Sequence, residues 1–442
     1  MNSRLGVFFI AAIVGLSCSD DVQGMEIRKV VSNKGVVAWF VPDKSVPLIA
    51  MNFVFRGAGS VTDPEGREGL AEMSSALLDE GAGEIRSADF QKKLEEIAAQ
   101  LSFSVGRDHY SGRLRTLSAN KDKAFNLLKL SLTSPRFDEK PVERIRGQLI
   151  ASLRRNVENP RRILDRAWLE TVFSGHPYSR PADGTENSLS TITQTDLRSF
   201  VSQRFTRDRL LIGVVGDISE AELKLRLDEV FSYLPQSGPT FYVSKATPAG
   251  PGRTVVIKKT IPQSVLTFGH VGIKREDPDW YAALLVTRIF GGGGFSSRLY
   301  EEIREKRGLA YSVYAYLRPM ESSALIIGGV ATQNSQAGES LRVVKREWDR
   351  LSKKGITKKE LADAKTYSNG SFPLRMDSSR GLSKLLVGIQ ISNLGIDYIF
   401  KRPSLISDVT LEDANRVARR LYDVSKLTAV IVGEPEGIQS VR

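Results

Sequence analysis

DLRSFVSQRFTRDRLLIGVVGD, residues 196–217, has a second copy of its pattern later in the chain. The counterpart is EDANRVARRLYDVSKLTAVIVGE, residues 412–434. Each stretch predicts an amphipathic helix, a short break and an apolar strand that ends in Gly and an acidic residue. The two copies are offset by roughly 215 residues, which is long enough for a complete domain.

Two further pairs of segments repeat at nearly the same offset. VPLIAMNFVFRGAGS begins at Val46 and QSVLTFGHVGIKR at Gln263, and both alternate as a strand does. FDEKPVERIRGQL from Phe137 matches ITKKELADAKTYS from Ile356. A near-constant shift at three places predicts an internal duplication. We therefore expect an α+β fold of two homologous domains, each a mainly antiparallel sheet with helices packed on one side.

The boundary between the two domains is expected near residues 234–253, LPQSGPTFYVSKATPAGPGR. This region is rich in Pro, Gly and Ser and has no hydrophobic periodicity. We place the N-terminal domain at 25–235, a linker at 236–253 and the C-terminal domain at 254–442. The chain of 442 residues is longer than one compact core usually serves, which agrees with two domains.

The first 24 residues are typical of an export signal. MNSR supplies a positive charge, and LGVFFIAAIVGL is an apolar run too short to span a bilayer comfortably. A signal peptide that is cleaved after Gly24 predicts an exported protein, and we expect it in the bacterial periplasm. After cleavage we expect no transmembrane anchor. A lipoprotein modified at Cys18 is the alternative, but Gly15-Leu16 ahead of it fits a lipoprotein signal poorly. A permanent membrane anchor fits the short run less well still.

Cysteine content and charge exclude several classes of function. Cys18 is the only cysteine, so a chain cleaved after Gly24 has no disulfide, no catalytic thiolate and no cysteine metal site. The formal net charge is +12, but no dense Lys/Arg run is interleaved with aromatic residues. We therefore expect a scattered basic surface and no nucleic-acid partner.

EGREGLAEMSSALLDEGAGE, residues 65–84, predicts a turn followed by a short helix. Its apolar positions fall on one helix face: Leu70, Met73, Leu77 and Leu78. The opposite face carries four other positions: Glu72, Ser75, Ala76 and Asp79. Positions 72, 75 and 76 have the spacing of a His-x-x-Glu-His zinc site, in which two imidazoles hold the metal and the Glu activates water. Here no residue at these positions is a histidine.

FGGGGFSSRLYEEIREKRGLAYSVYAY, residues 290–316, resembles the C-terminal signature of the insulinase, or pitrilysin, family of zinc peptidases, which includes mitochondrial processing peptidase. REGLAEMSSALLDEGA lies where that family carries its inverted zinc motif. The resemblance covers nearly all of the chain after residue 24 and implies paired homologous domains that form a clamshell around a chamber. It also implies zinc-binding histidines at the positions of Glu72 and Ala76 and a catalytic Glu at that of Ser75.

The resemblance further implies a third zinc ligand, a Glu at about Ala151 or Ser152, and this residue is also missing. The chain has only three histidines, at 109, 176 and 270, and none of them is spaced to pair with another. Zinc with a reactive water needs three protein ligands. We therefore expect no metal in this chain.

SSRLYEEIREKR, residues 296–307, predicts a helix that Glu302 and Lys306 support at i, i+4, and Gly308 is its expected C-terminal cap. LAYSVYAYL, residues 309–317, predicts the strand that follows.

Arg304 and Tyr311 preserve the spacing of a second family element. In the family, an Arg and a Tyr seven positions apart reach the zinc site and bind the substrate backbone and the developing oxyanion. A guanidinium and a phenol hydroxyl suit that role chemically. From composition alone, a surface charge and a sheet-packing ring are the alternative. Four glycines precede this element, Gly291, Gly292, Gly293 and Gly294, and they fit either a substrate-binding turn or a flexible connection.

These observations predict a catalytically silent subunit of an exported, heterodimeric zinc peptidase. It would supply Arg304 and Tyr311 to a zinc-bearing homologous partner that acts on peptide substrates, with the zinc held by the partner. The alternative is a non-enzymatic homologue that binds peptides, or has a structural or assembly role, as a homodimer. A third interpretation, an active peptidase with an unrecognised metal site, lacks any candidate ligand set.

Overall fold

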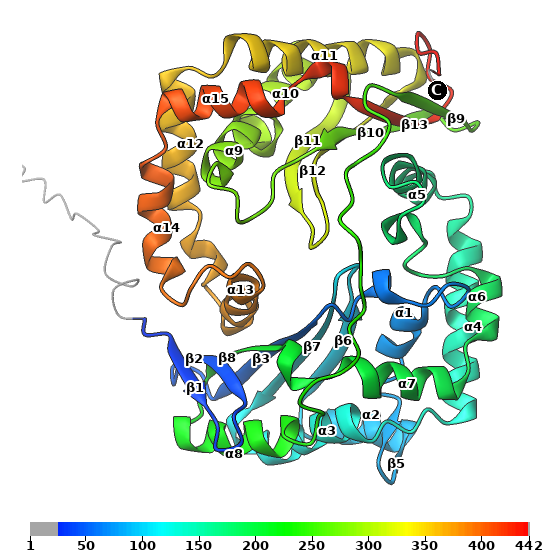
Figure 1. Cartoon of the computed structure of the whole chain (residues 1–442), viewed down its shortest axis with the longest axis vertical. Coiled ribbons are helices and arrows are strands. Elements are labelled where there is room, and N and C mark those ends of the chain that lie inside the picture. Colours follow the sequence, from blue (N-terminus) through cyan, green and yellow to red (C-terminus); the bar gives the residue numbers. More distant parts are fainter. Residues whose placement is uncertain (1–24, 441–442) are drawn as a thin grey trace, which may run out of the picture.

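The computed structural model describes residues 25–440 and contains two large sheets that face each other across the molecule (Figure 1). The predicted signal peptide, 1–24, and the alternative lipid-modification site at Cys18 lie outside the described residues. No helix within residues 25–440 is long and apolar enough to cross a membrane.

The N-terminal sheet has the strand order β1-β2-β8-β3-β7-β6. β2 and β8 are parallel, and every other neighbouring pair is antiparallel. Its strands are β1 (Arg28–Val31), β2 (Val37–Pro42), β3 (Leu48–Arg56), β6 (Gln100–Val105), β7 (His109–Leu117) and β8 (Leu210–Gly216). A small hairpin stands apart from this sheet and consists of β4 (Gly81–Ala82) and β5 (Ile85–Arg86).

The C-terminal sheet has the order β11-β12-β10-β13-β9, with only β13 and β9 parallel. Its strands are β9 (Thr254–Lys258), β10 (Gln263–Val271), β11 (Ala310–Pro319), β12 (Ala324–Gln333) and β13 (Thr428–Gly433). This order, including the one parallel pair, repeats the β6-β7-β3-β8-β2 part of the first sheet. The predicted duplication and the mainly antiparallel sheets are therefore confirmed.

Most helices also have an equivalent in the other half, but α8 follows β8 and no helix follows the equivalent strand β13 within the described residues. Those of the first half are α1 (Leu70–Ser75), α2 (Ser87–Glu96), α3 (Lys121–Thr133), α4 (Glu139–Asn156), α5 (Pro160–Val172), α6 (Glu186–Thr191), α7 (Gln194–Arg204) and α8 (Glu220–Phe231). Those of the second half are α9 (Trp280–Thr287), α10 (Arg298–Tyr300), α11 (Ala337–Lys354), α12 (Lys358–Gly370), α13 (Ser379–Ile391), α14 (Tyr398–Ser407) and α15 (Leu411–Leu421). The equivalent helices α7 and α15 even begin alike, because capping boxes formed by Thr193 with Asp196 and by Thr410 with Asp413 satisfy their first amides.

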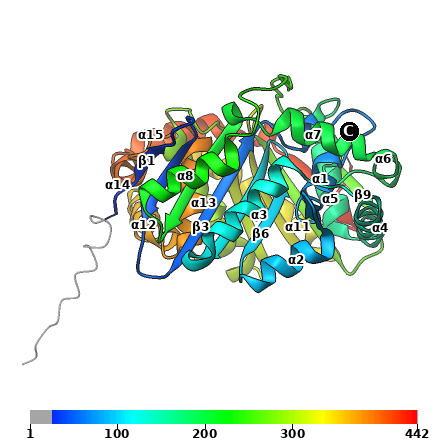
Figure 2. The same cartoon turned by 90° about the horizontal axis from the view of Figure 1, so that it is seen from below.

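Each sheet packs one face against helices of its own half. On the N-terminal sheet, α8, α3 and α2 lie across the strands (Figure 2), and they bury Leu223, Phe125 and Phe90 against it. On the C-terminal sheet, α9, α11 and α15 contribute Leu285, Trp348 and Val417 to the corresponding core. This is the predicted arrangement of helices on one side of each sheet.

The opposite face of each sheet is covered by a helix from the other half, which the sequence did not reveal. Helix α13 lies on β8 and β3 of the N-terminal sheet, and α5 lies on β13 and β10 of the C-terminal sheet (Figure 1). The α13 side buries Leu382, Leu386 and Ile389 with Val41 and Val215. The α5 side buries Leu164, Trp168, Leu169 and Val172 with Ile327, Val430 and Val432. The two equivalent helices are thus exchanged between the halves.

Helix α13 approaches the N-terminal sheet so closely that Gly213 in β8 leaves no room for a side chain. A Cβ atom on Gly213 would lie 2.6 Å from the backbone oxygen of Ser383 and 3.0 Å from Cβ of Leu386. Two side-chain hydrogen bonds join the same surfaces: Asn52 Nδ2 donates to Ser383 Oγ at 2.7 Å, and Gln390 Nε2 donates to the Ile212 carbonyl at 2.9 Å.

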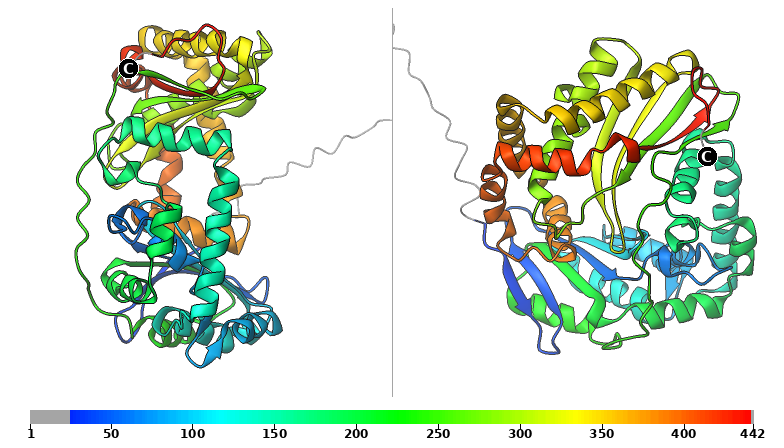
Figure 3. Two further views of the ribbon diagram at one scale, coloured as in Figure 1. Left: turned by 90° about the vertical axis from the view of Figure 1, so that its right-hand side faces the viewer. Right: turned by 45° about the horizontal axis from the view of Figure 1, so that its top comes forward.

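The segment expected to be a linker, 236–253, contains no helix or strand and runs along the side of the molecule (Figure 3). It is not free of the domains, because the Ala246 amide donates to the Ser322 carbonyl and the Ala249 amide to the Val172 carbonyl. The domain limits themselves stay a prediction.

Gly213→Ala should lower the free energy of unfolding by about 1–3 kcal/mol, because the added methyl group meets backbone that cannot move freely. Gly147→Ala is the matched control: it lies inside α4 with nothing within 4 Å of the added Cβ. The control should be neutral or more stable by up to about 1 kcal/mol. Urea denaturation of both variants measures the difference. Equal free energies of unfolding for the two variants would contradict a tight contact between α13 and β8.

Candidate functional site

Helix α1, which carries the zinc-motif positions, is held at its start by a buried carboxylate. Asp63 accepts hydrogen bonds from the Gly69 amide at 3.0 Å and the Ala71 amide at 3.1 Å. Burial raises the pKa of Asp63 to about 7, while the Arg204 guanidinium opposes that shift. The preceding turn needs Gly69, whose φ of 90° is left-handed.

Only one of the three zinc-motif positions faces open space. The predicted buried positions are confirmed, since Leu70 and Met73 of α1 and Leu77 and Leu78 of the turn after it are all buried. The helix ends at Ser75, however, and Ser75 is only 8% exposed. Its Oγ donates to the Glu72 carbonyl at 2.8 Å, so the hydroxyl bonds back to its own helix. Ala76 is half-buried against the N-terminal core.

Glu72 lines a cavity of about 870 Å³ between the two halves. The N-terminal half contributes α4, α5 and the loop around Asp183, and the C-terminal half contributes Tyr314, Tyr316 and Arg318 of β11. Burial raises the pKa of Glu72, and the nearby Asp183 carboxylate raises it further. The predicted chamber between the halves therefore exists beside the altered zinc motif, with side chains from both domains in its wall.

The place of the missing third ligand is next to this cavity. Helix α4 carries Ala151 and Ser152 and packs beside α1. Ser152 Oγ accepts a hydrogen bond from Asn156 Nδ2 at 3.4 Å, and Asn156 lines the cavity with Glu72. Because Ser152 lies one helical turn before Asn156, it is the better placed of the two positions.

Acidic residues and histidines elsewhere are engaged in other contacts. Glu143 pairs with Arg146, and Glu158 pairs with Lys259 of the other half. His176 Nδ1 accepts from the Tyr178 amide, and His270 packs edge-on against Trp348. Within residues 25–440, no three His, Cys, Asp or Glu side chains are arranged to hold a metal ion.

Arg304 and Tyr311 lie together, as their spacing predicts. The Arg304 guanidinium carbon is 4.4 Å from the Tyr311 ring centre and 4.9 Å from that of Tyr300, with Phe295 at 5.9 Å. Such contacts between a guanidinium and aromatic faces hold the charge in place. Tyr311 is 81% exposed and Phe295 80% exposed, so these rings do not serve the core. Phe295 and Tyr300 were not predicted to belong here, although both lie in the quoted signature.

The backbone around this pair differs in detail from the single helix that the sequence predicts. Only Arg298–Tyr300 is α-helical, and Glu301–Glu305 forms a π-helical turn. The expected pair of Glu302 and Lys306 is present at 2.7 Å. Gly308 ends the element with a φ of 61°, as a C-terminal glycine does. The strand predicted after it is β11.

The four glycines differ in their surroundings, since Gly291 is buried while Gly292 and Gly294 are exposed. Arg288–Gly292 is π-helical, and a Cβ on Gly291 would lie 2.7 Å from the Ala315 amide nitrogen of β11. Gly294 has a φ of 57°, which favours glycine. Close packing therefore explains Gly291, while a substrate-binding role for the run stays a prediction.

Comparison with known proteins agrees with this geometry. The profile of the family described as Insulinase (Peptidase family M16) matches residues 50–186, and that of the Peptidase M16 inactive domain matches residues 191–367. The chain belongs to peptidase family M16. A relative from Helicobacter pylori named Non-peptidase homolog YmxG is 28% identical over 88% of this chain and 89% of its own length. An uncharacterized zinc protease from Rickettsia felis is 24% identical over 93% of this chain and 98% of its own.

Two solved structures share the fold. A crystal structure described as a peptidase M16 inactive domain from Pseudomonas fluorescens has a TM-score of 0.86 and 26% identity, and it covers 94% of this chain and 100% of its own. A protease from Helicobacter pylori gives a TM-score of 0.82 at 20% identity. With Glu72, Ser75 and Ala76 at the motif positions, this chain is an inactive homologue of the M16 peptidases.

Restoring zinc binding should require the position on α4. Glu72→His with Ala76→His supplies only two of the three protein ligands that a catalytic zinc needs, so this variant should bind zinc weakly. Adding Ser152→Glu should tighten binding by more than about tenfold, or roughly 1.4 kcal/mol. Calorimetric titration with zinc measures the gain, with Ser152→Glu alone as the control. Tight binding by the two-histidine variant would contradict this placement of the third ligand.

Proposed function

We propose that this protein is a catalytically silent subunit of an exported, two-chain zinc peptidase. The observation that carries the proposal is the Arg304–Tyr311 pair: it is assembled, its phenol ring is exposed, and neither residue lines the cavity that contains Glu72. A pair displayed on the surface, away from its own chain's altered zinc motif, suits use by another chain. The export part of the proposal rests on the predicted signal at residues 1–24.

The chemistry assigned to the pair is stabilisation of negative charge. Hydrolysis of a peptide bond places negative charge on the carbonyl oxygen, and the zinc of the partner would supply the activated water. The Tyr311 hydroxyl donates one hydrogen bond, and the Arg304 guanidinium offers several donors in a fixed plane. The stacking of Arg304 on Tyr300 and Tyr311 orients that plane before substrate arrives, which lowers the entropy lost on binding.

A homodimeric, non-enzymatic homologue is the second candidate. The same exposed rings, Phe295 and Tyr311, suit a protein interface, because aromatic residues are enriched there. In that case the chamber would bind peptides without cutting them, or have a structural role. Co-purification from the native source separates the candidates: a zinc-bearing homologue in the complex supports the first, and a homodimer supports the second.

Tyr311→Phe should reduce turnover by the reconstituted pair by about a hundredfold or more, because loss of one oxyanion donor costs roughly 3 kcal/mol. The melting temperature should not change, since the ring is retained and the hydroxyl is exposed. Tyr242→Phe is the control, because Tyr242 is 86% exposed and lies in the segment that joins the two halves. Unchanged turnover by an assembled Tyr311→Phe pair would remove Tyr311 from the reaction.

Arg304→Ala should lower kcat and raise KM together, because a guanidinium can hold substrate carbonyls in both the ground and the transition state. The zinc content of the partner should stay the same. Gel filtration beside the kinetics shows whether the pair is intact. If turnover disappears only because the two chains separate, Arg304 belongs to the interface and the assigned chemistry is wrong.

A further inference from the structure

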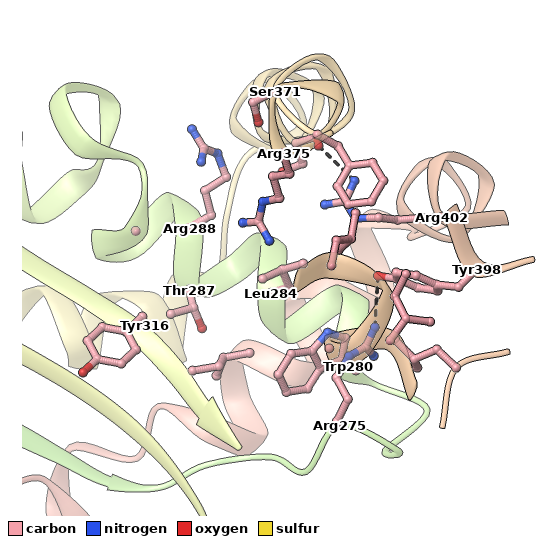
Figure 4. Close-up of a pocket in the computed structure, with 18 of the residues that line it drawn as sticks. Arg275, Trp280, Leu284, Thr287, Arg288, Tyr316, Ser371, Arg375, Tyr398 and Arg402 are labelled. Atoms are coloured by element: carbon pink, nitrogen blue, oxygen red, sulfur yellow. Dashed lines mark hydrogen bonds between the residues drawn. The ribbon is translucent and has the colours of Figure 1, made fainter. Parts of the chain in front are cut away.

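A second pocket, of about 510 Å³, lies in the C-terminal half between α9, α12, α13, α14 and β11. Four arginines line it: Arg275, Arg288, Arg375 and Arg402. No Asp or Glu lines it, and none of the four arginines forms an ion pair within residues 25–440. Figure 4 shows Arg288, Arg375 and Arg402 around one end of the pocket and Arg275 near Trp280 and Tyr398 at the other.

Three of these arginines are held in place by aromatic rings. Arg402 stacks on Phe372 at 4.2 Å and donates one hydrogen bond, from Nη1 to the Ser368 carbonyl at 3.0 Å. Arg288 lies 3.5 Å from the ring centre of Tyr367. Arg275 donates from Nη2 to the hydroxyls of two tyrosines, Tyr281 and Tyr398, each at 3.1 Å. The guanidinium groups are therefore ordered but keep unused donors, since each carries five N–H bonds.

The cluster also lacks counter-charge. Arg402 is only 9% exposed, and burial lowers its pKa, while nearby Arg375 acts in the same direction. Three acidic residues close to these elements in the sequence pair elsewhere: Asp277 and Asp279 pair with Arg416 and Arg420, and Asp397 pairs with Lys401. A buried charge without a partner is costly, so an anion that enters this pocket gains strong interactions.

We propose that this pocket binds the carboxylates of an acidic peptide segment. Tyr316 of β11 lines both this pocket and the cavity that contains Glu72, so a chain lying in the chamber reaches the arginines past one side chain. Apolar side chains line the rest of the wall and suit neighbouring aliphatic or aromatic residues of the peptide: Trp280, Leu284, Leu385 and Ile389. The hydroxyls of Thr287 and Ser371 add polar contacts.

This inference rests on the proposed function in one respect, that the ligand is a peptide. It does not require a zinc-bearing partner, because the pocket is formed within a single chain. Binding to the isolated chain and turnover by the pair can therefore fail independently. If the isolated chain binds the peptide but the two-chain complex shows no turnover, the result counts against the proposed function alone.

The test is fluorescence anisotropy with the isolated chain and a labelled peptide that carries three Glu residues among apolar ones. The same peptide with Gln in place of Glu should bind at least about tenfold more weakly, since hydrogen bonds to charged groups are the strong ones. Arg288→Gln and Arg375→Gln should each weaken binding of the Glu peptide several-fold. Arg380→Gln is the control, because Arg380 is exposed like Arg375 but does not line the pocket.

Melting temperatures show whether each variant is folded. Arg402→Lys keeps the positive charge but loses the planar guanidinium, so it tests the buried arginine. Equal binding of the Glu and Gln peptides would overturn the proposal. So would equal effects of the Arg375 and Arg380 variants. Citrate serves as a small free carboxylate: if it binds in an arginine-dependent way and the Glu peptide does not, the ligand is a small acid and the peptide assignment is wrong.

Discussion

Helices α5 and α13 each bury their apolar face against the sheet of the opposite half, and the rest of the architecture depends on this exchange. Neither sheet could cover its inner face with its own helices, which already pack on the other side. Each large apolar side chain buried in this way contributes about 1.5–3 kcal/mol. Separating the halves would expose both faces together, so these contacts hold the two domains around the chamber. Zinc has no part in these contacts, and a chain can lose the metal site without losing its shape.

The same two helices also form walls of the two cavities. Helix α5 contributes Ile163 and Trp168 to the cavity that contains Glu72, and α13 contributes Leu385 and Ile389 to the arginine-lined pocket. Tyr316 lies between these spaces. The two helices that join the domains, α5 and α13, therefore also form part of the cavity walls. A change that displaces α13, at Gly213 for example, should therefore also alter the arginine-lined pocket.

The sequence predicts what depends on local pattern. Alternation identified the strands that begin near Val46 and Gln263, helical periodicity identified the buried face of α1, and Gly308 was recognised as a helix end. The exchange of α5 and α13 was not predictable in this way, because an amphipathic face shows that a helix is buried but not which sheet covers it. The π-helical turns at 288–292 and 301–305 have no periodic signal either. The arginines of the second pocket are spread from 275 to 402 and come together only through the fold.

The two pockets differ in charge, and the difference bears on how an inactive homologue could still handle peptides. The cavity beside α1 has Glu72, Asp165, Asp183 and Glu186 among five arginines, so its charges nearly balance. The raised pKa of Glu72 is the effect of burial beside a second carboxylate, not of preparation for metal binding. The pocket beside α13 has four arginines and no acid. The cavity lined by basic side chains and no acidic ones therefore lies in the C-terminal half, and not beside the altered zinc motif. Recognition of an acidic ligand there needs neither zinc nor hydrolysis, and a subunit that only positions peptides would retain it.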